Sequence, residues 1–132
     1  MDQILGDVIE LSIVVGDLEA AVDRYARLFG LKVHRRTESQ EFGFKNAILP
    51  LGRGHIELLQ PTDPSKPLAR YLERHGEGVY LVGFEASEIP SAVEHLRSQG
   101  AEVDLRGATL AWVHPRGAHG VMVELRRPET YD

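Results

Sequence analysis

Three glutamates stand inside short apolar segments that have the alternating pattern of β-strands. Glu57 lies in GHIELLQP, Glu124 in GVMVELRRP and Glu10 in VIELSIVV. Burying a carboxylate costs free energy unless a partner compensates its charge, and three carboxylates in one pocket cannot all stay ionised without a cation. These residues therefore suit two kinds of chemistry, the binding of a divalent metal and the transfer of a proton.

The side chains present restrict which metal such a site would take. The chain has no cysteine, which excludes thiolate ligands. A site of carboxylate oxygens favours Mg, Mn or Ca over Zn, and a protein without a metal is the alternative. His55 precedes Glu57 by two residues on the same strand face and is a candidate nitrogen ligand. It is equally open that the three glutamates are ordinary carboxylates, solvated or paired with Arg53, Arg126 or a histidine.

The first half of the chain is expected to fold in the order βαβββ. Asp17 is the predicted N-cap of the helix and Gly30 its end. The apolar spacing between them is that of a helix packed on a sheet. The predicted strands comprise residues 8–15, 31–37, 43–49 and 55–60.

The second half repeats this order after a Pro-rich loop and a short helix that begins near Pro67. ELSIVVGDLEAAV aligns without a gap on LVGFEASEIPSAV, and HIELLQP aligns on MVELRRP. This alignment matches Glu57 with Glu124 and Glu10 with Leu81. The predicted elements of this half are strands at 78–86, 101–105, 109–115 and 121–126, and a helix at 89–99.

The predicted fold class is therefore α+β, with two tandem βαβββ modules that form a cleft or half-barrel. Residues 1–132 are expected to form one domain, with modules at about 8–61 and 79–128 and a linker helix at about 62–78. The floor of the cleft would hold Glu10, Glu57, Leu81 and Glu124. Four residues are candidates for contact with a ligand in this cleft: His55, Leu81, Gly83 and Trp112.

Each of these four also has a purely structural explanation. Gly83, whose missing side chain would leave room for a ligand, is equally consistent with a bulge, and Trp112 is equally consistent with a core position. His55 is equally consistent with a strand-end histidine. Leu81 makes the cleft more apolar.

Composition limits the partners. The net charge is −5 and no long run of Lys or Arg occurs, so a nucleic-acid partner is not expected. A small-molecule ligand is the expected partner. The N-terminal segment opens with acidic residues, and its apolar run is too short to span a membrane, which predicts a cytoplasmic protein without membrane association.

Several longer motifs carry a resemblance to a known family. They include VVGDLEAAVDRYARLFGLKV, EFGFKNAILPLG, SKPLARYLERHGEG and HPRGAHGVMVEL. Together they resemble the vicinal-oxygen-chelate superfamily, which includes the glyoxalases and bleomycin resistance proteins, and within it the methylmalonyl-CoA epimerases. The resemblance runs from about residue 8 to residue 125 and implies a glyoxalase-like fold and a homodimer.

The resemblance also implies where a divalent metal would bind. The family takes one ligand from the first strand and one from the last strand of each module, usually His, Glu or Gln, His and Glu in chain order. Those positions are Glu10, Glu57, Leu81 and Glu124 here. Leu81 cannot bind a metal, so the metal site is expected to be altered or lost.

The catalytic residues implied by the epimerases are a pair of glutamates. Glu41 in EFGFKNAILPLG falls on the position of the base that removes a proton next to a thioester carbonyl, and Glu124 is its counterpart. On its own, Glu41 is equally consistent with a solvated turn.

Three functions stay open from the sequence. The first is an isomerase (epimerase) or lyase acting by proton transfer next to a carbonyl, for example in an acyl-CoA thioester. The second is a metal-free protein of the same fold that binds a hydrophobic small molecule. The third is a metal-free enzyme that uses the same carboxylates for a different proton transfer.

Overall fold

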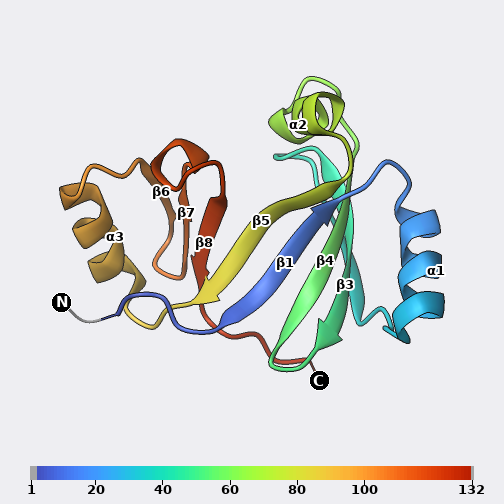
Figure 1. Cartoon of the computed structure of the whole chain (residues 1–132), viewed down its shortest axis with the longest axis horizontal. Coiled ribbons are helices and arrows are strands. Elements are labelled where there is room, and N and C mark those ends of the chain that lie inside the picture. Colours follow the sequence, from blue (N-terminus) through green and yellow to red (C-terminus); the bar gives the residue numbers. More distant parts are fainter. Residues whose placement is uncertain (1–2, 132) are drawn as a thin grey trace. The chain divides into compact units, whose positions relative to one another are not determined.

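The computed structural model describes residues 3–131, which form eight strands, three α-helices and one 3₁₀ turn (Figure 1). Their order is βαβββ, a helix, and βαβββ again, as the internal repeat predicts. The predicted α+β class is confirmed. In chain order the elements are β1 (Val8–Val14), α1 (Leu18–Phe29), β2 (Arg35–Ser39), β3 (Phe44–Leu51), β4 (Gly54–Pro61), α2 (Pro67–His75), β5 (Gly78–Glu85), α3 (Ile89–Ser98), β6 (Val103–Arg106), β7 (Leu110–Val113), the 3₁₀ turn η1 (Pro115–Gly117) and β8 (Met122–Arg126).

The chain divides into two compact units, and the division cuts through two strands. Residues 3–11 and 81–130 form one unit, called here the Glu124 unit, and residues 12–80 with Tyr131 form the other, called the Glu57 unit. Strands β1 and β5 each contribute residues to both units. The strand order is β2-β3-β4-β1 in the Glu57 unit and β1-β5-β8-β7-β6 in the Glu124 unit.

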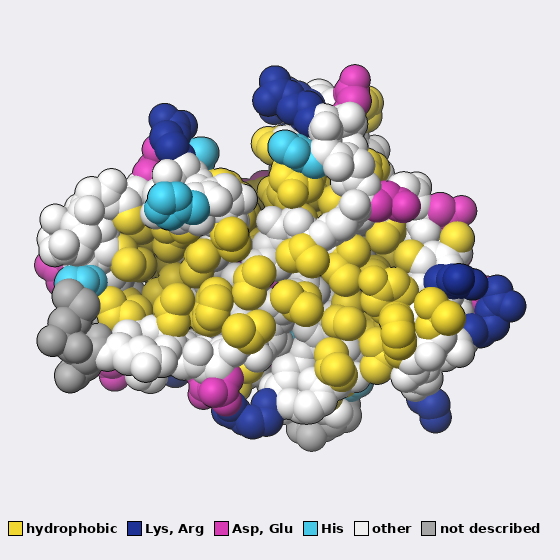
Figure 2. All heavy atoms as spheres, in the orientation of Figure 1, with side chains coloured by type: hydrophobic (Ala, Val, Ile, Leu, Met, Phe, Trp, Pro, Cys, Tyr) yellow, Lys and Arg dark blue, Asp and Glu magenta, His cyan; other side chains and the backbone are white. Residues whose placement is uncertain are grey.

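In the Glu57 unit, the local signals for helix α1 are those predicted. The side chain of Asp17 accepts a hydrogen bond from the N–H of Ala20 at 3.1 Å, and Gly30 ends the helix with a left-handed backbone, φ 70°. The helix buries Leu18 against the inner faces of β3 and β4. Figure 2 shows hydrophobic side chains gathered between α1 and the strands of this unit.

Strand β2 differs from its predicted range. It covers Arg35–Ser39 rather than residues 31–37, and it pairs with β3 in antiparallel register up to Ser39 opposite Phe44. Leu31 and Val33 do point their side chains into the core beside α1, but their backbone lies outside the ladder. Alternating apolar residues in a connecting segment therefore imitated the pattern of a strand.

In the Glu124 unit, helix α3 packs on β6 and β7 over its own core. Strand β8 runs parallel to β5 and antiparallel to β7, so it has a strand on each side. This central position determines which side chains neighbour Glu124. The buried core residues of this unit are Ala86, Ile89, Ala92, Val93, Val103, Ala111, Val113 and Leu125.

None of the helices in the described part of the chain has the length and apolar character that a membrane crossing requires.

Candidate functional site

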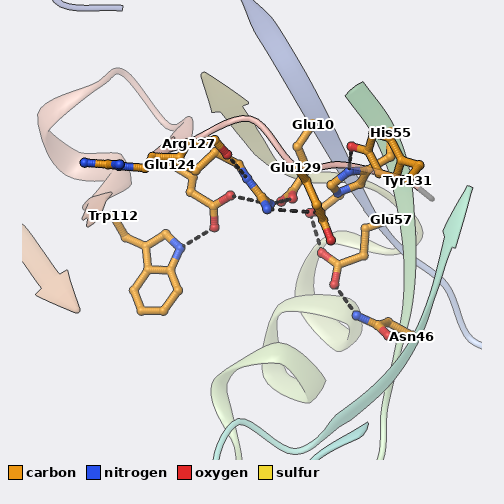
Figure 3. Close-up of polar contacts among 11 residues, drawn as sticks. Glu10, Asn46, His55, Glu57, Trp112, Glu124, Arg127, Glu129 and Tyr131 are labelled. Atoms are coloured by element: carbon orange, nitrogen blue, oxygen red, sulfur yellow. Dashed lines mark hydrogen bonds and ion pairs between the residues drawn. The ribbon is translucent and has the colours of Figure 1, made fainter. Parts of the chain in front are cut away.

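Glu124 lies on β8, the middle strand of the Glu124 unit, on the face opposite the core residue Leu125, and only 5% of the residue is exposed. Glu124 is opposite Gly83 on β5 and opposite Trp112 on β7. Because opposite residues in a ladder project on the same face, the indole of Trp112 reaches the carboxyl and donates a hydrogen bond from Nε1 to Oε1 at 2.8 Å (Figure 3). The predicted ligand-contact residue Trp112 is thus a direct neighbour of Glu124.

A guanidinium lies beside this carboxyl group. Arg126 follows Glu124 by two residues on β8 and shares its face. Its Nη1 donates to Glu10 and lies 3.4 Å from Oε2 of Glu124, and its Nη2 lies 3.2 Å from Oε2 of Glu129. One arginine therefore joins three carboxylates, two of which were candidate metal ligands.

Gly83 provides the space for this arrangement. A Cβ atom at this position would lie 2.8 Å from the Cβ of Glu10, 3.2 Å from Oε2 of Glu124 and 3.5 Å from Cδ of Arg126. The first distance is below any normal carbon–carbon contact. The room left by Gly83 is filled by side chains of the protein itself, in particular those of Glu10 and Arg126.

Burial changes the ionisation of Glu124. Burial first, and then the neighbouring Glu10 carboxylate, raise the pKa of Glu124 to about 8, although the charge of Arg126 and the Trp112 hydrogen bond act in the opposite direction. A carboxyl group with this pKa is mostly protonated at neutral pH. It combines an O–H donor with the ability to give up its proton close to physiological pH.

Glu57, the counterpart of Glu124 in the repeat, has neutral hydrogen-bond donors around it. On β3, Asn46 donates from Nδ2 to Oε2 of Glu57 at 2.5 Å (Figure 3). Ser12 on β1 donates from its hydroxyl to Oε1 of Glu57 at 2.6 Å. The amide oxygen of Asn46 in turn accepts from the backbone N–H and the hydroxyl of Thr37, at 2.9 and 2.6 Å. This network extends across four strands of the Glu57 unit.

His55 and Leu81 are both buried. His55 shares strand β4 with Glu57 and is 3% exposed, and its Nδ1 lies 2.5 Å from the hydroxyl of Tyr131. Leu81 lies on β5 and is 7% exposed. Their candidate roles as ligand contacts stay predictions.

Glu41 lies in the turn between β2 and β3, where its side chain is exposed. The exposed turn agrees with the simpler explanation of this residue, and a role as base would require bound substrate to exclude water from it.

The donor groups in the Glu124 unit do not fit the divalent site that the family resemblance implies. Leu81 has no donor atom, and Glu10 and Glu124 both lie against the guanidinium of Arg126. Within residues 3–131, no group of three or more His, Asp or Glu side chains is arranged to hold a metal ion.

Among the residues that contact the candidate carboxylates, Arg126 in the Glu124 unit and Asn46 in the Glu57 unit were not predicted as functional. Arg126 appeared only as one possible partner for a solvated carboxylate, although its spacing of two residues from Glu124 places both on one strand face. Asn46 gave no signal, because a lone amide in an apolar strand does not show which carboxylate it will meet.

Comparison with known proteins shows the family to which the sequence belongs. Residues 10–110 match the family described as Glyoxalase/Bleomycin resistance protein/Dioxygenase superfamily. Among curated proteins, an ethylmalonyl-CoA/methylmalonyl-CoA epimerase from Cereibacter sphaeroides is 28% identical, over 93% of this chain and 98% of that protein. The human mitochondrial methylmalonyl-CoA epimerase is also 28% identical, over 96% of this chain and 80% of that protein.

Comparison with solved structures also finds methylmalonyl-CoA epimerases. A methylmalonyl-CoA epimerase from Mycobacterium tuberculosis superimposes with a TM-score of 0.86 at 26% identity, covering 98% of this chain and 93% of that chain. A variant of the Streptomyces coelicolor methylmalonyl-CoA epimerase, in complex with 2-nitronate-propionyl-CoA, gives 0.87 at 25% identity, covering 96% of this chain and 99% of that chain. The family match spans most of the sequence, and the chain belongs to the Glyoxalase/Bleomycin resistance protein/Dioxygenase superfamily.

Proposed function

We propose that this protein is an epimerase-type enzyme that transfers a proton at the carbon next to the carbonyl of an acyl-CoA thioester. The observation that carries the proposal is Glu124, a buried carboxyl group whose pKa is raised to about 8. The similarity to methylmalonyl-CoA epimerases along nearly the whole chain supports the reaction class. An acyl-CoA complex of one such relative supports the substrate class.

Glu124 is the proposed acid of the reaction. A general acid or base is most effective when its pKa lies near the working pH, and this carboxyl meets that condition because it is removed from water. The Trp112 hydrogen bond to Oε1 fixes the orientation of the carboxyl plane. Oε2 faces Arg126, whose positive charge stabilises the carboxylate that remains after the proton has left.

Glu41 is the proposed base. Its carboxylate takes the proton from the carbon next to the carbonyl, and the electron pair of that C–H bond forms an enolate. Protonation of the same carbon by Glu124 from the opposite face gives the other epimer and leaves Glu124 as a carboxylate. The two glutamates then regain their starting protonation states by exchange with water, so that the cycle is balanced.

The alternative is a metal-free binding protein for a small apolar molecule. Two observations favour it: the family's ligand position is occupied by the buried Leu81, and Glu41 is exposed. This alternative predicts ligand binding without proton exchange, so a single assay separates the two functions.

The test is hydrogen exchange at the carbon next to the carbonyl of a 2-methyl acyl-CoA thioester in heavy water, followed by NMR. The wild-type protein is expected to catalyse exchange. Glu124→Gln and Glu41→Gln are each expected to slow the interconversion of the two epimers of this thioester by about 100-fold or more, a typical contribution of one acid or base. Glu94→Gln on the exposed side of α3 is the matched control and should leave the rate unchanged.

Either glutamate alone could still remove a proton and return a deuteron on its own face, so interconversion of the two epimers is followed in the same samples. Interconversion that survives in one glutamate variant removes that residue from the mechanism. If the wild-type protein shows no exchange but binds an apolar ligand, the binding function replaces the enzymatic one.

A further inference from the structure

The contacts of Arg126 suggest which cation the carboxylates of the Glu124 unit use. The guanidinium, on a side chain that is 21% exposed, contacts Glu10, Glu124 and Glu129. The side chains of Glu10 and Glu124 are only 5% and 7% exposed. A buried carboxylate needs a nearby opposite charge, and in this unit Arg126 supplies it.

The backbone is built to admit this arginine. At Gly83, opposite Glu124, a Cβ atom would lie too close to the Cβ of Glu10 and tightly against Oε2 of Glu124, and it would touch Cδ of Arg126 at an ordinary contact distance. Glycine at this point allows the arginine side chain to cross β5 and reach Glu10. The position of the guanidinium thus depends on two strands and is not the chance conformation of a surface side chain.

We propose that Arg126 is the resident cation of this site, taking the place of the divalent metal that the family resemblance implies. A guanidinium remains charged at all physiological pH values and presents several N–H donors. It therefore supplies the positive charge beside the Glu10 carboxylate without a metal, and a metal would first have to displace it. Because Leu81 has no donor atom, a metal that entered this site would lack one of the ligands that the family resemblance implies. The proposal concerns the identity of the cation and does not depend on the reaction proposed above.

The test measures Mn²⁺ binding rather than turnover. The apo protein is titrated with Mn²⁺ and the free ion is followed by electron paramagnetic resonance. The wild-type protein is expected to show only weak, non-stoichiometric binding. Arg126→Met keeps the apolar stem but frees the carboxylates, and it is expected to bind one Mn²⁺ at least about tenfold more tightly, since Mn²⁺ prefers oxygen ligands.

The control variant is Arg127→Met. It removes the same charge from the next, exposed residue and should bind Mn²⁺ as weakly as the wild type. A second control combines Glu10→Gln with Arg126→Met. It removes a charge and its counter-charge together, and is expected to fold and to lose the gain in Mn²⁺ affinity.

Arg126→Met leaves the buried Glu10 carboxylate without its cation, so the single variant is also examined by circular dichroism. If it is unfolded alone, Mn²⁺ is expected to refold it, while the double variant is folded without Mn²⁺. Stoichiometric, micromolar Mn²⁺ binding by the wild type overturns the proposal. The proposal is also overturned if Arg126→Met binds Mn²⁺ no more tightly than Arg127→Met does. It is likewise overturned if Arg126→Met is unfolded and Mn²⁺ does not refold it.

Discussion

Glu124 is surrounded by groups with opposing effects on its ionisation. Burial and the Glu10 carboxylate favour the protonated form, while Arg126 and the indole N–H of Trp112 favour the charged form. The balance lies on the protonated side, with a pKa of about 8. The outcome is a carboxyl group that is mostly protonated at neutral pH, although it lies beside a guanidinium.

Trp112 gives a direct measurement of this balance. It is the one tryptophan of the chain and it is hydrogen-bonded to Glu124. We expect its fluorescence to change with pH with a midpoint near the Glu124 pKa of about 8. The change should be absent in Glu124→Gln and present in Glu94→Gln. A fluorescence transition near pH 4.5 in the wild type would contradict the raised pKa.

The ionisation of Glu124 is also expected to make the free energy of unfolding depend on pH. The folded-state pKa of Glu124 lies above its ordinary value of 4.5, so the folded state holds the extra proton between pH 4.5 and about 8. The free energy of unfolding therefore falls as the pH rises through this range, by at most about 1.4 kcal/mol per pH unit. Urea unfolding of Glu124→Gln should show a smaller fall than that of the wild type.

Strands β5 and β8 form the element that positions the site. Their parallel register places Gly83 beside Glu124 and leaves space through which the Arg126 side chain reaches Glu10. A methyl group at Gly83 would lie too close to the Cβ of Glu10 and tightly against Oε2 of Glu124, while Cδ of Arg126 would lie at an ordinary contact distance.

Gly83→Ala is therefore expected to lower the free energy of unfolding by about 1–3 kcal/mol, as overpacking of a filled interior does. Gly16→Ala is the matched control, because its added Cβ would meet only Oε2 of Glu77, at an ordinary 3.8 Å. Urea unfolding measures both variants. Equal stability of Gly83→Ala and the wild type would show that Glu10 and Arg126 can move aside.

The elements themselves were largely predictable. Asp17 and Gly30 bound helix α1 because cap residues act through local hydrogen bonds and backbone angles. The internal repeat predicted the second βαβββ set. Strand β2 was misplaced because Leu31 and Val33 face the core from a connecting segment, and a side-chain pattern does not show which backbone groups pair.

The candidate site was predictable only in part. Sequence alone placed Glu124 in a strand of the repeat, but its pKa depends on Trp112 and Glu10, which lie on other strands. Likewise, the sequence shows that Glu124 and Arg126 are two residues apart. It does not show that the space at Gly83 lets the guanidinium reach Glu10.

For the chain as a whole, family membership and the repeated βαβββ order are shown, while several broader expectations stay predictions. These are a homodimer, a cytoplasmic location and the module boundaries at about 8–61 and 79–128. The boundary between the compact units cuts through β1 and β5. Glu10 therefore belongs to the unit that contains Glu124, although it is nearer to Glu57 in the sequence. Proximity in the chain is thus a poor guide to which carboxylates share a cation.

The central claim is proton transfer by the protein's own side chains, with Arg126 as the cation. The most direct test compares the rate of deuterium exchange into a 2-methyl acyl-CoA thioester by wild-type protein in excess EDTA and in added Mn²⁺. We expect exchange in both conditions at the same rate within error, because the Arg126 guanidinium is present in both. Exchange that occurs only with Mn²⁺, or that EDTA abolishes, would contradict the account.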